Sequence, residues 1–327
     1  MPWGINITER WLGIPFPIPT PGSFLQIRRE VRRADAVLLQ DSLYPACIAA
    51  FVFARSFRKP VVIAQHVGIV PYNNPVFRLI MQLANRIVVR PMLARADRIA
   101  FFSEITANYF SGINFRSSPE LIFTGVDTDV YFPISANRKL ESRRDLGFEP
   151  DRPVVLFVGR FVEKKGLHIL SRMARIRPDI IWALAGWGPL NPADWALPNV
   201  IVFSDLAGAS LAALYRASDV LVLPSKGEGF PLVIQEALAC GLPVVCSADT
   251  ARADAAASQF LSTVELDEKH PDATALAFCE EIARALEGRG NARAPSQERF
   301  RFVSERYCWR ATAARYFDVI CSALAKD

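Results

Sequence analysis

The sequence contains no apolar stretch of about eighteen residues without charged side chains, which is the length that a membrane-spanning helix requires. Its N-terminus also lacks the basic and then apolar order of a secretion signal. Its six cysteines are dispersed without C-x-x-C spacing, and no pair of its three histidines has metal-ligand spacing. We therefore expect a cytoplasmic protein with reduced thiols and without a bound metal or other cofactor.

The length and composition indicate two globular domains. With 327 residues, of which 51% are hydrophobic, the chain can bury two separate cores. Strand-like apolar runs alternate with helical patterns, which is typical of an α/β protein with parallel sheets. We expect a first domain over residues 1–145, ending in a polar linker at 135–144. A second domain follows over residues 146–308, and a last helix over residues 309–327 returns to the first domain.

The whole chain has a net charge of +5, and its positive charge is concentrated in the first third. The arginines there are Arg28, Arg29, Arg32, Arg33, Arg78, Arg86, Arg90, Arg95 and Arg98. No recognisable nucleic-acid-binding module accompanies them, which argues against nucleic acid as the partner. Residues 75–94 mix arginines with aliphatic residues, a pattern that fits either a helix on an anionic membrane surface or a core helix with a solvated basic edge. We expect Pro91 to kink or end this helix.

The most informative segment is GEGFPLVIQEALACG, residues 227–241, which follows an apolar strand at 220–223. Pro231 suits the first position of a helix, and Gly241 suits its end. The backbone around Phe230, Pro231 and Leu232 then lies at the positive end of the helix dipole, where unpaired N–H groups bind phosphate.

Two glutamates lie on either side of this helix start. Glu236 is about 6 Å along the helix axis, where a carboxylate can accept hydrogen bonds from a ribose diol. Glu228 lies in the preceding loop, where it can face a sugar joined to the phosphate. Solvated acidic residues remain the alternative interpretation for the pair.

Two further loops follow strands in the same half of the chain. The strand at 153–158 is followed by Arg160 and Lys165, a pair of cations that can neutralise a diphosphate without a metal. The strand at 180–184 is followed by Gly186 and Gly188, whose missing side chains let backbone approach a ligand.

The order GR…KKG, AGWGPL and KGEGFPLVIQEALACGLPVV resembles glycosyltransferase family 4, and the resemblance extends over most of the chain. It implies the GT-B fold, in which two Rossmann-like domains with parallel sheets face a central cleft. The second domain of such enzymes binds most of the nucleotide-sugar and the first binds the acceptor. The family retains anomeric configuration and needs no divalent metal.

The resemblance also implies individual roles. Arg160 and Lys165 bind the diphosphate, Glu236 binds the ribose hydroxyls and Glu228 binds the transferred sugar. The donor-binding set is completed by Gly186, Gly188, Phe230, Pro231 and Leu232. His66, at the end of a strand over residues 61–64, becomes a catalytic candidate beside the donor sugar, although a structural histidine is the alternative.

The chain departs from the family at its start. Only thirty-three residues precede Ala34, whereas family members begin with a strand, a Gly-rich loop, a helix and another strand. Gly4 and Gly13 do not form the paired-glycine loop of that unit. We expect either a shortened first domain or a start assigned too late.

These observations predict a retaining hexosyltransferase that moves sugar from a nucleotide-sugar to a glycan or lipid-linked acceptor in polysaccharide or glycolipid biosynthesis. An anionic membrane surface at the inner face of the cell membrane is a second expected partner. Two alternatives remain: a nucleotide-sugar epimerase or phosphorylase of the same architecture, and a shortened, inactive protein that only binds a sugar nucleotide.

Overall fold

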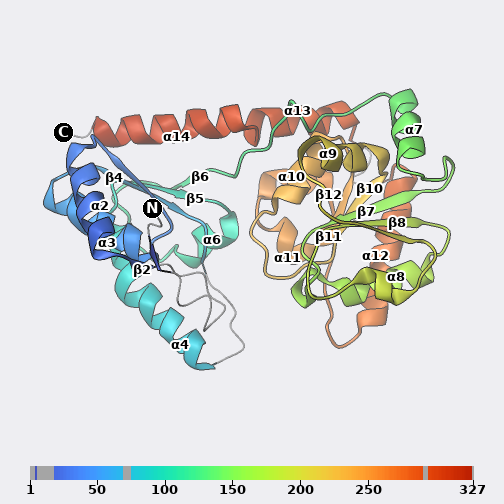
Figure 1. Ribbon diagram of the computed structural model, residues 1–327, viewed down its shortest axis with the longest axis horizontal. Coiled ribbons are helices and arrows are strands. Elements are labelled where there is room, and N and C mark those ends of the chain that lie inside the picture. Colours follow the sequence, from blue (N-terminus) through green and yellow to red (C-terminus); the bar gives the residue numbers. More distant parts are fainter. Residues whose placement is uncertain (1–3, 6–17, 69–74, 290–293, 326–327) are drawn as a thin grey trace. The chain divides into compact units, whose positions relative to one another are not determined.

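The structure is a computed structural model that describes residues 4–5, 18–68, 75–289 and 294–325 (Figure 1). Contacts divide the chain into a first unit, Met1–Phe123 with Ala313–Asp327, and a second unit, Thr124–Thr312. The main sheet of each unit is parallel, with four strands in the first and six in the second, which confirms the predicted α/β class. Within the described ranges, no helix combines the length and hydrophobicity needed to cross a membrane.

The sheet of the first unit has the order β3-β4-β5-β6. Its strands are β3 (Val37–Gln40), β4 (Val61–Gln65), β5 (Arg98–Phe101) and β6 (Glu120–Leu121). Besides the last helix of the chain, the described α-helices of this unit are α2 (Pro21–Arg33), α3 (Pro45–Ser56), α4 (Pro75–Ala84), α5 (Arg90–Arg95) and α6 (Glu104–Tyr109). Gly4 lies in a two-residue strand, β1 (Gly4–Ile5), that pairs with β2 (Ile18–Pro19), and Gly13 lies outside the described residues.

Alternate residues of this sheet face different layers. Val61 and Ile63 pack in one cluster with α3 and α5, whereas Val62 packs in another with Val319 and Ala323 of the last helix, α14 (Trp309–Leu324). Because side chains alternate between the two faces of a strand, these clusters cover opposite faces of the sheet.

The helix after β4 does not end at Pro91. It runs from α4 through a π-helical turn, η1 (Asn85–Val89), into α5, and it ends at Arg95. The backbone N–H of Arg90 donates to the carbonyl of Asn85, five residues back. Proline clashes with the carbonyl four residues before it, and the wider π turn just ahead of Pro91 opens the hydrogen-bond ladder there.

The sheet of the second unit has the order β9-β8-β7-β10-β11-β12, which is the 3-2-1-4-5-6 order of a Rossmann fold. Its strands are β7 (Val154–Val158), β8 (Ile181–Ala185), β9 (Val200–Phe203), β10 (Val220–Leu223), β11 (Val244–Ser247) and β12 (Leu261–Val264). The α-helices of this unit are α7 (Ala136–Asp145), α8 (Leu167–Ile176), α9 (Gly208–Ala217), α10 (Leu232–Ala239), α11 (Ala248–Ala251), α12 (Pro271–Leu286) and α13 (Ser296–Arg306). Short 3₁₀ helices are η2 (Glu163–Lys165), η3 (Pro192–Trp195) and η4 (Ala255–Phe260).

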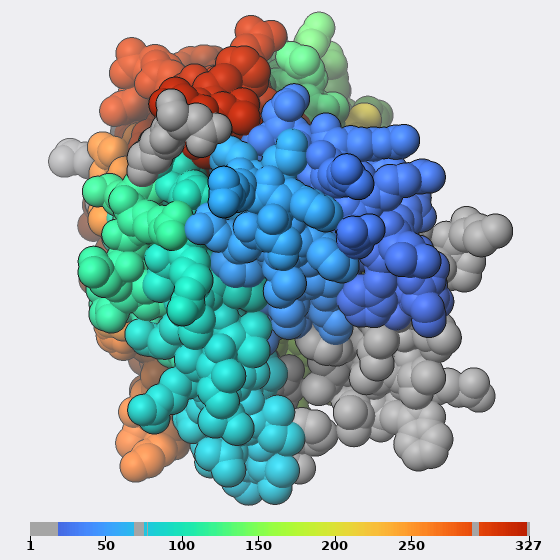
Figure 2. All heavy atoms as spheres, turned by 90° about the vertical axis from the view of Figure 1, so that its left-hand side faces the viewer, coloured from blue at the N-terminus to red at the C-terminus, as the bar shows by residue number. Residues whose placement is uncertain are grey.

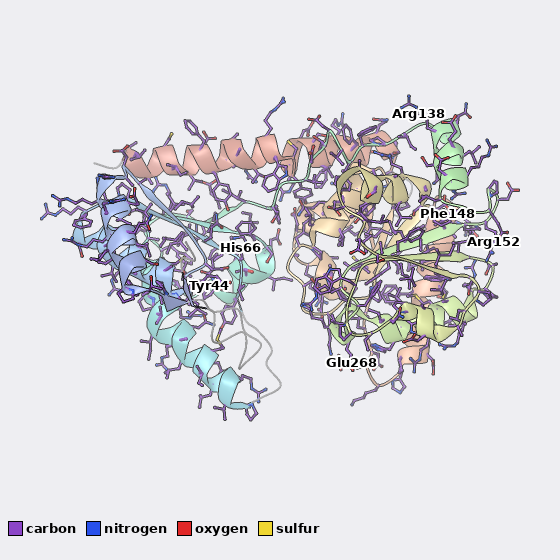
Figure 3. The ribbon with its side chains drawn as sticks, in the orientation of Figure 1. Tyr44, His66, Arg138, Phe148, Arg152 and Glu268 are labelled. Carbon is purple, nitrogen blue, oxygen red and sulfur yellow. The ribbon has the colours of Figure 1, made fainter. Side chains whose placement is uncertain are left out.

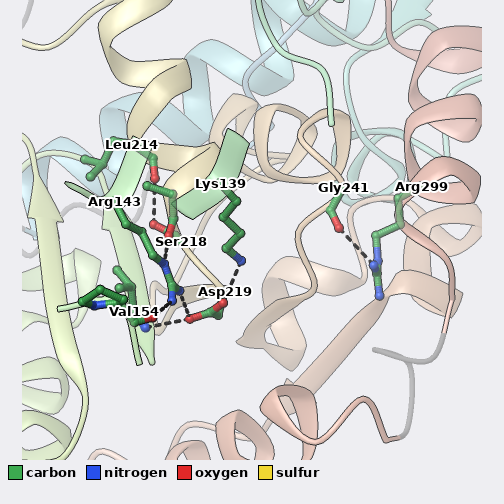
Figure 4. A network of polar contacts seen from close by, with 10 residues as sticks. Lys139, Arg143, Val154, Leu214, Ser218, Asp219, Gly241 and Arg299 are labelled. Carbon is green, nitrogen blue, oxygen red and sulfur yellow. Dashed lines mark hydrogen bonds and ion pairs between the residues drawn. The ribbon is translucent and has the colours of Figure 1, made fainter. Parts of the chain in front are cut away.

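The segment predicted as a polar linker is helix α7, and it belongs to the second unit. Its Lys139 Nζ lies 2.7 Å from Asp219 Oδ1, and Arg143 pairs with the same carboxylate (Figure 4). Asp219 Oδ2 also accepts the backbone N–H of Val154 at 2.8 Å, so one carboxylate joins α7 to the first strand of this sheet. The structure therefore places the boundary near residue 123, whereas the sequence predicted it at 145.

Candidate functional site

Three loops meet at the carboxyl edge of the second sheet, because they follow the adjacent strands β8, β7 and β10. The backbone N–H of Phe161 donates to the backbone carbonyl of Trp187 at 2.7 Å, and the N–H of Leu190 donates to the carbonyl of Phe161 at 3.1 Å. The backbone N–H of Lys226 donates to the backbone carbonyl of Lys164 at 3.0 Å. The order of the strands reverses between β7 and β10, and open α/β sheets bind ligands at that point.

Gly186 and Gly188 are required for contact between the loops. A Cβ on Gly186 would lie 1.8 Å from the carbonyl oxygen of Gly159, and a Cβ on Gly188 would lie 2.3 Å from that of Phe161. The sequence predicted that these glycines admit a ligand. In the structure, the space that their side chains would fill is occupied by the neighbouring loop.

Lys165 and Glu228 come from different loops and form an ion pair. Lys165 Nζ lies 3.0 Å from Glu228 Oε1, and their side chains are only 13% and 12% exposed. Lys164, whose side chain is 59% exposed, lies 3.8 Å from the same oxygen. Because Lys165 follows β7 and Glu228 follows β10, this pair lies at the topological switch point.

Arg160 interacts with an aromatic residue that the sequence analysis did not single out. The guanidinium carbon of Arg160 lies 4.9 Å from the ring centre of Trp187, within the range of a cation–π contact. The Trp187 side chain is itself 66% exposed. The arginine thus remains at the surface of the loops with its orientation supported by the indole ring.

Helix α10 begins one residue later than predicted, at Leu232, and Pro231 is its N-cap residue. Proline has no N–H, so the anion-binding donors available here are the first helical amides, at Leu232 and Val233. Phe230 is buried, with its ring 5.3 Å from that of Tyr307. Its side chain therefore anchors the loop to the core of the unit.

The opposite end of α10 is held by Arg299. Its Nη1 donates to the carbonyl of Gly241 at 3.0 Å, and the side chain is buried (Figure 4). Burial lowers the pKa of Arg299 to about 10, yet the group stays charged at neutral pH. A cation at a helix C-terminus stabilises the helix dipole, so this contact supports the helix that carries Glu236.

Glu236 lies inside α10 and is held by two tyrosines. Its Oε2 accepts a hydrogen bond from Tyr215 at 2.8 Å, and Tyr131 donates a second. Burial raises the pKa of Glu236, and the two hydrogen bonds oppose that shift. A carboxylate offers about four acceptor positions, so about two remain for a ribose diol. Neither tyrosine was predicted, because each is distant from Glu236 in the sequence.

His66 lies in the first unit directly after β4 (Figure 3), and it contacts residues at the ends of β3 and β5. Its Nε2 lies 2.7 Å from Gln40 Oε1, and its backbone N–H donates to Asp41 at 2.8 Å. Its ring stacks on Phe102 with centroids 3.4 Å apart. Burial lowers the pKa of His66, and the charge of Asp41 opposes this. Because an amide oxygen only accepts, the proton lies on Nε2, and Nδ1 of the neutral ring is a hydrogen-bond acceptor.

Replacing Gln40 with glutamate is expected to raise the pKa of His66 by about one pH unit or more, because a carboxylate beside Nε2 stabilises the imidazolium. His66 should then be charged in a pH range just above its present pKa, where the wild-type ring is neutral. Titration of the ring signals of the three histidines by NMR measures this. Gln40→Ala, which removes the acceptor without adding charge, is the control. An equal pKa in all three proteins would contradict the hydrogen bond.

The comparisons with known proteins agree with this architecture. Residues 138–300 match the family described as Glycosyl transferases group 1. A D-inositol 3-phosphate glycosyltransferase from Mycobacterium sp. (strain KMS) is 34% identical over 169 residues, which are 47% of this chain and 37% of that protein. The corresponding protein of Segniliparus rotundus is 30% identical over 240 residues, 68% of this chain and 51% of the relative. The chain thus spans about half, or less, of the length of these curated relatives.

Solved structures share the fold over most of this chain. A sucrose-phosphate synthase from Thermosynechococcus elongatus superimposes with a TM-score of 0.69 at 21% identity, covering 95% of this chain and 81% of that one. Anabaena HepE, solved in complex with UDP-glucose, has a TM-score of 0.66 at 19% identity and covers 92% of this chain and 82% of its own. The chain therefore has the GT-B fold, and its residues 138–300 match the model of the glycosyl transferases group 1 family.

Proposed function

We propose that this protein is a retaining glycosyltransferase that uses a nucleoside diphosphate sugar. The observation that carries the proposal is the contact between Lys165 and Glu228, at 3.0 Å, at the switch point of the second sheet. A cation suited to a diphosphate and a carboxylate suited to sugar hydroxyls are adjacent there, as are the two chemical parts of such a donor.

Each part of the donor has a proposed partner. Lys165, Arg160 and the first amides of α10 bind the diphosphate and stabilise the negative charge that develops as it leaves. Glu236 accepts hydrogen bonds from the ribose hydroxyls, and Glu228 orients the sugar. Transfer then depends on stabilisation of the developing charge and on positioning of the molecule that receives the sugar. His66 Nδ1 would accept a hydrogen bond from that molecule.

We also propose a class of donor and a class of acceptor. A UDP-sugar is the first donor to test, since Anabaena HepE was solved with UDP-glucose. The acceptor we propose is a glycan or a lipid-linked saccharide of polysaccharide or glycolipid biosynthesis, reached from the cytoplasmic side of the cell membrane. No divalent metal is required in this proposal, because two cations of the protein neutralise the diphosphate.

The two glutamates provide the test of this arrangement. Glu236→Ala should weaken binding of the free nucleoside diphosphate about tenfold or more, because it removes hydrogen bonds to a charged group that are worth about 1.5–3 kcal/mol. Glu228→Ala should leave the affinity for the free nucleotide nearly unchanged while turnover of the nucleotide-sugar falls. Calorimetry and product analysis measure the two effects. If both variants bind the free nucleotide equally well, the proposed division between ribose and sugar is wrong.

A further inference from the structure

Helix α4 has an apolar surface that the rest of the described chain does not cover. Its aliphatic side chains are more than half exposed: Val76 62%, Leu79 64%, Ile80 52% and Leu83 54%, followed by Ile87 at 61% in the π turn. The spacing of three, four, seven and eleven residues from the first of them places these side chains on one face of a helix. We refer to these five residues as the α4 stripe.

The structure separates the two interpretations that the sequence left open for residues 75–94. The C-terminal part of this helix is core, since Val89, Met92 and Leu93 are buried in the cluster beneath the sheet. The N-terminal part extends from the first unit, as Figures 1 and 2 show for α4 in cyan. One continuous helix therefore has a packed half and an uncovered apolar half. Uncovered apolar patches of this kind mark interaction surfaces.

The charged residues of α4 and the π turn are all of one sign. The sequence has no aspartate or glutamate between residues 42 and 96, whereas Arg78 and Arg86 are exposed on the same helix as the stripe. Neither arginine has an ion-pair partner among the described residues. Arg90 is different, because its Nη2 donates to the carbonyl of Tyr109 at 3.2 Å and its guanidinium lies over the ring of Phe110.

We propose that the α4 stripe inserts into the interface of an anionic lipid bilayer, with Arg78 and Arg86 in contact with lipid headgroups. Aliphatic side chains gain by leaving water for the acyl boundary, and arginines on the same helix gain from the negative surface potential. A second copy of this chain fits the surface less well. Two α4 stripes in contact would bring four arginines together without a carboxylate from residues 42–96 to neutralise them.

The proposal predicts two separable losses of binding to vesicles. Changing Leu79, Ile80 and Leu83 together to glutamine should weaken binding to phosphatidylglycerol-containing vesicles at least about tenfold, because the inserted apolar area is lost. Changing Arg78 and Arg86 to glutamine should weaken it about fivefold for each charge at low salt and much less at high salt. Co-sedimentation with these vesicles, and with vesicles of phosphatidylcholine alone, measures both effects.

The matched control is Leu276→Gln on α12, a leucine that is 51% exposed in the other unit. All changed residues are exposed, so melting temperatures should stay near that of the wild type. The proposal is supported if the α4 variants lose binding and the control does not. It is overturned if the wild type does not bind anionic vesicles at low salt, or if the control loses as much as the α4 variants. It is also overturned if the wild type self-associates through α4 in light scattering and does not bind vesicles. Each result is independent of whether the protein transfers a sugar.

Discussion

Replacing both Arg160 and Lys165 with alanine is expected to weaken binding of a nucleoside diphosphate sugar at least about a hundredfold. Each residue would supply a charge-assisted hydrogen bond of about 1.5–3 kcal/mol to the diphosphate, and about 1.4 kcal/mol corresponds to a factor of ten. Isothermal titration calorimetry with UDP-glucose, and with UDP alone, measures the loss. The diphosphate is common to both ligands, so both affinities should fall together.

Lys164→Ala is the matched control for this experiment. Lys164 lies on the same loop and carries the same charge, but its side chain is 59% exposed and lies 3.8 Å from Glu228. Its loss should change the affinity only slightly. Removal of Lys165 leaves the largely buried Glu228 without its nearest cation and can destabilise the fold, so thermal melting must accompany the titration. Arg160→Ala alone is a further variant, in which the ion pair between Lys165 and Glu228 is kept. An unchanged affinity in the double variant would remove both residues from the donor site.

Gly186→Ala is expected to destabilise the second unit by about 3 kcal/mol or more, which corresponds to a fall in melting temperature of roughly 6–12 °C. The new methyl group would lie 1.8 Å from the carbonyl oxygen of Gly159, which is backbone that cannot rotate away. The loops after β7 and β8 must therefore separate. Since Arg160 follows Gly159 directly, affinity for the nucleotide should fall as well. Differential scanning calorimetry and nucleotide titration measure the two effects.

Gly208→Ala serves as the control. Gly208 has a φ of +53°, and nothing lies within 4 Å of the position where a Cβ would be. Its replacement should cost only the left-handed backbone strain, roughly 1–2 kcal/mol, and should leave nucleotide binding unchanged. Equal melting temperatures for wild type and Gly186→Ala would mean that the two loops are not in contact as described.

The local elements of the second unit could be read from the sequence because each depends on neighbouring residues. The apolar run at 220–223 is strand β10, with identical bounds. The loop residues were predicted by the same reasoning, since glycines and cations after a buried strand lie at the carboxyl edge of a parallel sheet. Residues 135–144 were misread as a linker. Their helix is stabilised by Asp219, a residue far along the chain that no local pattern reveals.

The sequence by itself determined the α/β class, the positions of several strands and the loops that carry Arg160, Lys165, Glu228 and Glu236, because hydrophobic periodicity and turn chemistry act over a few residues. Only the tertiary structure decided which partners these side chains have. Tyr215 binds Glu236, Trp187 contacts Arg160 and Gln40 binds His66, and each partner comes from another element. Likewise, periodicity identified an amphipathic helix at residues 75–94, but packing decided which half of it remains uncovered. Exposure depends on what the rest of the chain brings against a surface, and that is a property of the folded molecule.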